Sequence, residues 1–237
     1  SGGTVSVAND DYNSLGGAIT VNQGGILSTD STGNNAHNIA GITLNGGTLS
    51  SSGNTYGEGN WIFNGDVTVG GSALSTISGY AVGSKEGGGT YNVSDSVAGS
   101  GTDLLVTANM VNASGGSYLT KTGAGTMEIT GANNYSGDTT VNGGTLILKA
   151  SSAYYNYSSS QFNINNGSTL KVQDTLLFQN DTFVFGSSGG GTLEIGAGNN
   201  VFRGDNTFTT LGGSQNAITG TFLNSDGGGT RTFNIAD

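Results

Sequence analysis

A short phrase, in which apolar residues flank a corner of Asn and Gly, recurs along the chain and restricts the fold more than any other feature. It is Ile-Thr-Val-Asn-Gln-Gly-Gly-Ile-Leu at residues 19–27 and Ile-Thr-Leu-Asn-Gly-Gly-Thr-Leu at residues 42–49. These copies are 23 residues apart, counted from Asn22 to Asn45, and solenoid repeats are typically about 20–45 residues long. Related phrases occur at residues 140–146 and 163–170. The pattern predicts one coil per phrase, with apolar side chains inside and stacked Asn side chains at the bends.

The use of glycine and proline supports this pattern. The chain has 45 glycines and no proline among its 237 residues. Glycines separate short runs rich in Thr, Val and Ile, such as residues 126–130, 139–141 and 145–148, which is typical of short strands between tight turns. A strand paired on both sides needs its backbone N–H groups, and proline has none. The lack of proline therefore favours a continuous hydrogen-bonded ladder over a flexible linker.

These features predict one all-β domain over residues 1–237, wound as a parallel β-helix with short protruding loops. Coils of about 22 residues, stacked about 4.8 Å apart, would give roughly ten or eleven coils. The densest apolar clusters, and hence the expected core, are residues 61–63, 104–106, 176–178 and 183–185. Residues 83–89 and 150–161 depart from the rhythm and are expected to protrude.

A longer repeat relates residues 71–95 to residues 213–237 at an offset of 142 (213 − 71 = 142). Such long-range repetition is typical of elongated arrays. Because the first copy is followed by further strands, we expect the native protein to continue beyond Asp237, so that this chain is a fragment.

Charge and composition exclude several classes of partner and site. The formal net charge is -10, from 16 acidic and six basic side chains, which disfavours binding to nucleic acid. There is no cysteine, so disulfides and thiolate metal sites are excluded. No apolar run is long enough for a transmembrane helix, so this segment is not expected to insert into a membrane.

Residues 119–148 contain, in order, Leu-Thr-Lys-Thr-Gly-Ala-Gly-Thr at 119–126, Asn-Tyr-Ser-Gly at 134–137 and Asn-Gly-Gly-Thr-Leu at 142–146. This stretch resembles the passenger-associated transport repeat of bacterial autotransporters, the proteins of type V secretion. The resemblance implies a passenger domain that folds outside the cell as a right-handed parallel β-helix, either tethered to the outer membrane or secreted.

Parallel β-helices also host polysaccharide lyases and hydrolases, so a glycan-active enzyme is an alternative. Glycoside hydrolysis usually needs two of them close together. Asp10 and Asp11 would face opposite ways in a strand, and Glu128 and Glu194 would point outward. The remaining candidates flank the strand of Trp61; they are Glu58 and Asp66. We predict no catalytic residue.

Metal and cofactor sites are not expected either. His37 is the only histidine, lies in a polar run, and is predicted to be in a surface loop. Residues 196–206 faintly resemble the calcium-binding nonapeptide of β-rolls, but Asn replaces most of the aspartates that would bind the ion.

The tyrosines at residues 154–157 are the most plausible recognition surface. Exposed aromatic side chains stack on sugar rings and bury area at low entropic cost, so Tyr154, Tyr155 and Tyr157 are candidates for contact with a glycan or a protein. The alternative is that they fold over the shaft and cover its apolar edge.

The function predicted from sequence is a non-catalytic structural or adhesive stalk of a cell-surface, autotransporter-like protein. Its partners would be glycans or proteins on host or bacterial surfaces, or further copies of itself. Two alternatives stay open: a glycan-active enzyme on a β-helix, and a self-assembling extracellular filament or sheath subunit.

Overall fold

The computed structural model describes most of the chain. The described residues are 2–7, 14–29, 36–51, 61–84, 88–99, 101–113, 116–150, 160–174, 177–186, 189–196, 201–212, 215–221, 223–224 and 231–235.

In the described residues, the strands form four parallel sheets. Sheet A has ten strands, in the order β1 (Thr4–Val7), β4 (Ile26–Thr29), β7 (Thr48–Ser51), β10 (Ser75–Gly79), β13 (Leu104–Val106), β16 (Thr126–Ile129), β19 (Thr145–Ala150), β21 (Ser168–Asp174), β24 (Gly191–Ile195) and β27 (Ala217–Gly220). Sheet C also has ten, in the order β3 (Ile19–Asn22), β6 (Ile42–Asn45), β9 (Val67–Gly70), β12 (Gly89–Val93), β15 (Leu119–Thr122), β18 (Thr139–Val141), β20 (Gln161–Ile164), β23 (Thr182–Phe185), β26 (Asn206–Thr210) and β29 (Arg231–Asn234).

The third side of the coil is divided between two smaller sheets. Sheet B contains β2 (Ser14–Leu15), β5 (His37–Ile39), β8 (Trp61–Phe63), β11 (Ala81–Ser84), β14 (Asn109–Asn112) and β17 (Asn133–Asn134). Sheet D contains β22 (Leu177–Gln179), β25 (Val201–Arg203) and β28 (Leu223–Asn224).

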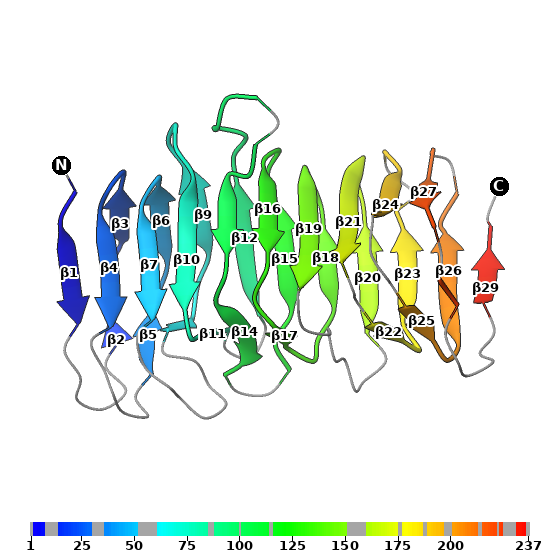
Figure 1. Ribbon diagram of the computed structural model, residues 1–237, viewed down its shortest axis with the longest axis horizontal. Helices are drawn as coiled ribbons and strands as arrows, with labels where there is room; N and C mark the ends of the chain where they lie inside the picture. The colour runs from blue at the N-terminus through cyan, green and yellow to red at the C-terminus, as the bar shows by residue number, and fades with distance from the viewer. Residues whose placement is uncertain are drawn as a thin grey trace.

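The chain visits these sheets in turn, which makes a helix of β-strands. It runs from β3 in sheet C to β4 in sheet A and β5 in sheet B, and then returns to sheet C as β6. The coils stack along the long axis, with the two ends of the chain at opposite ends of the molecule (Figure 1). The predicted parallel β-helix is confirmed.

Inside the helix, alternate residues of each strand form columns because the coils pair in parallel register. Leu27, Leu49 and Ile77 are register partners in sheet A, and all three are buried. The length of a coil varies around these fixed columns: Met127 pairs with Leu146, 19 residues on, whereas Ser75 pairs with Leu104, 29 residues on.

Phenylalanine rings form the column in the C-terminal part of sheet C. Their centroids are 5.0 Å apart at each step, and the interplanar angles are 10–12°. The stacked rings are Phe162, Phe183, Phe208 and Phe233. A second stack in sheet D, Phe178 on Phe202, packs against this column.

Two sequence-based predictions need correction, and one loop was not predicted. His37 is not on the surface: it is fully buried in β5, with its ring 5.4 Å from that of Trp61, because it occupies an inward position of the strand. The predicted bounds of the loop at residues 83–89 are wrong, because Gly83 belongs to β11 and Gly89 begins β12. A protruding loop that sequence reasoning missed lies between β12 and β13, and its described residues are 94–99 and 101–103 (Figure 1).

Candidate functional site

The outer face of sheet C is a regular array of uncharged, mainly polar side chains. Thr20, Thr43 and Thr68 are register partners on successive strands, and the same row continues through Asn92 to Thr122. A neighbouring row joins Thr90, Thr120, Thr140 and Asn163. In the described strands β3 to β26 of this sheet, the outward positions carry no charged side chain.

The corners at the end of sheet C are joined by asparagine ladders, as the recurring phrase predicted. The side-chain amide of Asn45 donates to Asn22 at 3.2 Å, and that of Asn165 donates to Asn142 at 2.9 Å. Each hydrogen bond connects one coil to the next, so the amides satisfy each other while the backbone turns. The ladders hold the edge of the neutral face in register.

An open hollow interrupts this face where β3, β6 and β9 begin. Its volume is about 360 Å³, and small residues make room for it; the lining includes Gly17, Ala18, Gly41, Thr43 and Asp66. Asp66 is exposed. A hollow that combines hydroxyl, carboxylate and apolar groups has the chemistry to hold a small polar ring, such as a sugar.

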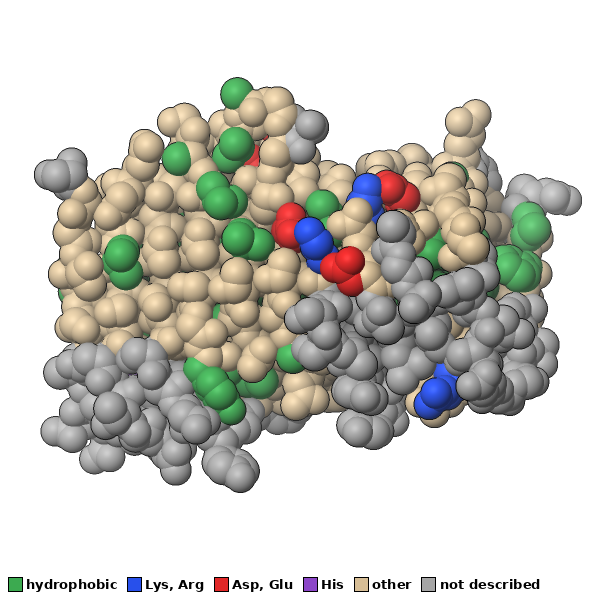
Figure 2. All heavy atoms as spheres, viewed as in Figure 1, with side chains coloured by type: hydrophobic (Ala, Val, Ile, Leu, Met, Phe, Trp, Pro, Cys, Tyr) green, Lys and Arg blue, Asp and Glu red, His purple; other side chains and the backbone are tan. Residues whose placement is uncertain are grey.

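Sheet A differs because its outer face carries a band of charges. Figure 2 shows basic side chains beside acidic ones across the middle of this face, within a surface that is otherwise mostly uncharged. Lys171 pairs with Glu194 at 2.6 Å and Lys149 with Glu128 at 3.9 Å. All four residues lie on the successive strands β16, β19, β21 and β24.

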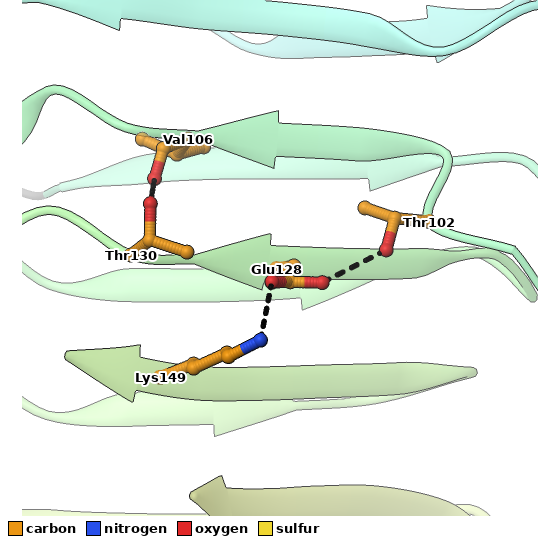
Figure 3. Close-up of polar contacts among 5 residues, drawn as sticks. All are labelled: Thr102, Val106, Glu128, Thr130 and Lys149. Carbon is orange, nitrogen blue, oxygen red and sulfur yellow. Dashed lines mark hydrogen bonds and ion pairs between the residues drawn. The ribbon is translucent and has the colours of Figure 1, made fainter. Parts of the chain in front are cut away.

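Glu128 has a second partner that crosses to the preceding coil. The hydroxyl of Thr102 donates to its carboxylate at 3.0 Å, and in the same region Thr130 donates to the carbonyl of Val106 at 3.5 Å (Figure 3). The carboxylate therefore ties three coils together at the surface. Exposed pairs of this kind contribute little stability each, because water screens them.

The interior of the corner between sheets C and A holds a buried lysine. Lys121 faces inward from β15 and is fully buried. Its ammonium donates to the carbonyls of Thr122 at 3.3 Å, Gly123 at 3.0 Å and Gly143 at 2.8 Å. Burial lowers the pKa of Lys121 to about 8, and the carboxylate of Asp103 partly opposes this.

Asp103 closes the neighbouring corner, where the loop at residues 94–103 returns to sheet A. Its carboxylate accepts the backbone N–H groups of Ser96 at 2.9 Å, Val97 at 2.8 Å and Thr126 at 2.8 Å. Burial by itself would raise the pKa of Asp103, but the hydrogen bonds from Ser96, Thr126 and Val97 outweigh it and hold the pKa below its ordinary value. Sequence reasoning missed both this residue and Lys121.

The residues predicted from sequence as contacts are not placed by the structure. Tyr154, Tyr155 and Tyr157 lie outside the described residues, as do Asp10, Asp11 and Glu58. The other candidate carboxylates are separated, since Glu128 is on β16 and Glu194 on β24, with β19 and β21 between them. Within the described ranges, no three His, Asp or Glu side chains lie close enough together to hold a metal ion.

Comparison with known proteins places these features in a family. Residues 119–148 match the model of the passenger-associated-transport-repeat. The chain is 32% identical over 232 residues, 92% of its length, to the adhesin BmaC autotransporter of Brucella suis biovar 1 (strain 1330). It spans 6% of the length of that relative. No solved structure matches the chain.

These matches agree with the geometry. The matched repeat includes Lys121, the glycines at both of its corners, and the Asn142 ladder position. No helix among the described residues has the length and apolar character needed to span a bilayer. The predicted resemblance is confirmed: the chain belongs to the passenger domains of autotransporters, and it is a β-helix that lies outside the cell, at its surface.

Proposed function

We propose that this segment is a structural and adhesive, non-catalytic part of its passenger, and that the outer face of sheet C makes the adhesive contacts. The adhesive role is supported by the name of the relative, which is an adhesin. The choice of face rests on one observation: ten strands present aligned Thr and Asn side chains, without a charged side chain from β3 to β26 in the described residues.

A neutral polar face suits contact with a large, hydroxyl-rich surface. Hydroxyl and amide groups both donate and accept hydrogen bonds, and removing them from water costs less than removing ions. Each contact is weak, but many act together because the rigid ladder presents them simultaneously. The partners are therefore glycans or glycosylated proteins on host or bacterial surfaces, with the hollow beside Asp66 as one sugar-binding position.

The adhesive role of the outer face of sheet C can be tested by adding long, charged side chains to it. In one variant Thr43, Thr68 and Thr140 become Lys; these threonines point outward on β6, β9 and β18. The matched control places Lys at Ser28, Ser50 and Thr76, outward positions on β4, β7 and β10 of sheet A. Both variants add the same charge to an outer strand surface.

Binding is measured on a glycan array and on immobilised surface glycoproteins, with thermal unfolding as the check on folding. The sheet C variant is expected to lose about tenfold or more in affinity, or about 1.4 kcal/mol, while the control retains wild-type binding. Equal losses in both variants, or a loss in the control alone, would contradict the choice of face.

The same samples address the two other functions considered from sequence. Sedimentation of the wild-type chain at increasing concentration reports self-association, and filaments would appear by electron microscopy. Incubation with a panel of polysaccharides reports catalysis; turnover of any of them would contradict a non-catalytic role.

A further inference from the structure

The corners between sheets C and A contain an interaction that neither the fold nor adhesion requires. Three such corners stack on one another: residues 94–103, the turn after β15 and the turn after β18. At this stack a lysine side chain occupies a column position between Tyr91 and Val141, its register partners in the adjacent coils. An apolar side chain could occupy this position of the column in place of the lysine.

The contacts of Lys121 come from two different coils. Thr122 and Gly123 belong to its own corner, whereas Gly143 belongs to the corner of the following coil and makes the shortest of the three hydrogen bonds, at 2.8 Å. These corners also touch directly: a Cβ on Gly143 would lie 3.0 Å from the carbonyl oxygen of Gly123. The ammonium therefore fills a ring of carbonyl oxygens that is complete only when both coils are closed.

The next layer extends the connection to the preceding coil. The N–H of Thr126, at the start of β16, donates to Asp103, and the N–H of Gly125 donates to the carbonyl of Val93. The N–H of Thr145, at the start of β19, donates to the carbonyl of Gly125. Opening any one of these corners would therefore leave either the ammonium or the carboxylate of Asp103 inside the core without its partners.

We propose that Lys121 is a clamp that makes its own corner and the corner of the following coil, residues 119–126 and 139–145, open and close as one cooperative unit. A charged group is retained in the core because a buried ammonium tolerates one arrangement of its carbonyl partners, whereas an apolar side chain would accept several. The clamp thus sets the register in which the later coil stacks on the earlier one. This inference is independent of the adhesive role.

The first test uses the unchanged chain. Reaction of Lys121 with an amine-acylating reagent requires the clamp to open, and exchange of the amide hydrogens of Thr126 and Thr145 requires the two corners to open. Lys149 and Lys171, which are partly exposed, give the reaction rate of accessible lysines. Each measurement gives an equilibrium constant for opening, at Lys121, Thr126 and Thr145. The three opening constants are expected to agree within about threefold. An opening constant for Lys121 that exceeds the two amide values by about tenfold would overturn the proposal.

The second test uses Lys121→Met, which keeps the length of the side chain and removes the ammonium. The opening constants at Thr126 and Thr145 are expected to separate by about tenfold or more, because the two corners are no longer coupled. Lys171→Met is the matched control and should leave them equal. Equal constants in Lys121→Met would refute the clamp. If that variant does not fold, the comparison in the unchanged chain decides alone.

Discussion

Two parts of this β-helix stack their coils by different means. In residues 160–210 the column within sheet C is made of aromatic rings, each 5.0 Å from the next. In residues 93–145 the corners between sheets C and A contain a buried lysine and a buried aspartate, whose partners are backbone groups of their own and of adjacent coils. Ring stacking is strong but tolerant of small shifts, whereas hydrogen bonds to buried charges are strict in geometry. The difference suggests that the first part supplies stability and the second supplies register.

The largest expected effect comes from breaking the aromatic column. Phe183 is fully buried and its ring contacts those of Phe162, Phe178, Phe202 and Phe208. Phe183→Ala is expected to lower the free energy of unfolding by about 3–5 kcal/mol, measured by urea denaturation.

Its control is another phenylalanine of the same column. Phe233 is 53% exposed and stacks on Phe208, so Phe233→Ala should cost about 1 kcal/mol or less. Similar losses in the two variants would show that the column is not the source of stability.

The next effect comes from Asp103. Asp103→Ala leaves the partly buried N–H groups of Ser96, Val97 and Thr126 without their carboxylate acceptor, so we expect a loss of about 2–3 kcal/mol at neutral pH. Because its folded-state pKa is lowered, the stabilisation by Asp103 is complete above the unfolded pKa and disappears as the pH falls through the folded value. Urea denaturation between pH 7 and pH 2 should therefore show a shallower acid slope in Asp103→Asn than in the wild type.

Lys121 gives a smaller effect, which lies at alkaline pH. Its pKa is about 8 in the folded chain and 10.5 in the reference state, so between these values the unfolded chain holds the extra proton and stability rises with pH. The rise between pH 8 and pH 10 is expected to be at most about 2 kcal/mol. Above pH 10 stability is expected to fall again. Burial raises the pKa of Tyr91 in the folded chain, so this hydroxyl ionises at a lower pH in the unfolded chain.

Thermal unfolding at several alkaline pH values measures this rise, and Lys121→Met should remove it. Lys149→Met, which replaces an exposed lysine, should retain it. A wild-type stability that falls steadily from pH 8 would mean that the ammonium is not buried in solution.

The smallest expected effect concerns the ladders. Asn165→Ala removes one hydrogen bond, to Asn142, at a partly buried corner, and should cost about 1 kcal/mol. Asn92→Ala, which changes the same residue type at an exposed position of β12, is the comparison. A larger loss at Asn92 than at Asn165 would contradict the structural role of the ladder.

The general architecture was predictable because it repeats. The phrase around Asn22 and Asn45 indicated a coil, and the two side chains are indeed hydrogen-bonded across coils. His37 was misjudged because its polar neighbours were taken as a loop; in a three-residue strand, alternation is too short to identify the inward position. Lys121 had a usable signal, since the flanking Thr120 and Thr122 point outward and leave it inside.

The corner partners were beyond sequence reasoning. Nothing in the order of residues indicates that Asp103 reaches Thr126, because the connection depends on how a ten-residue loop returns to the next coil. Contacts between backbone carbonyls and one ammonium are likewise set by the stacking of turns and not by residue type. Repetition reveals which residues share a column, whereas the departures from repetition are visible only in three dimensions.

The variable length of the coils has a consequence for how such a molecule can change. Register steps of 19 and 29 residues coexist in sheet A without displacing the inward columns, so added residues are accommodated in the connections outside the ladder. New segments can therefore be inserted between strands at little energetic cost, and recognition properties can diversify while the shaft beneath them stays the same.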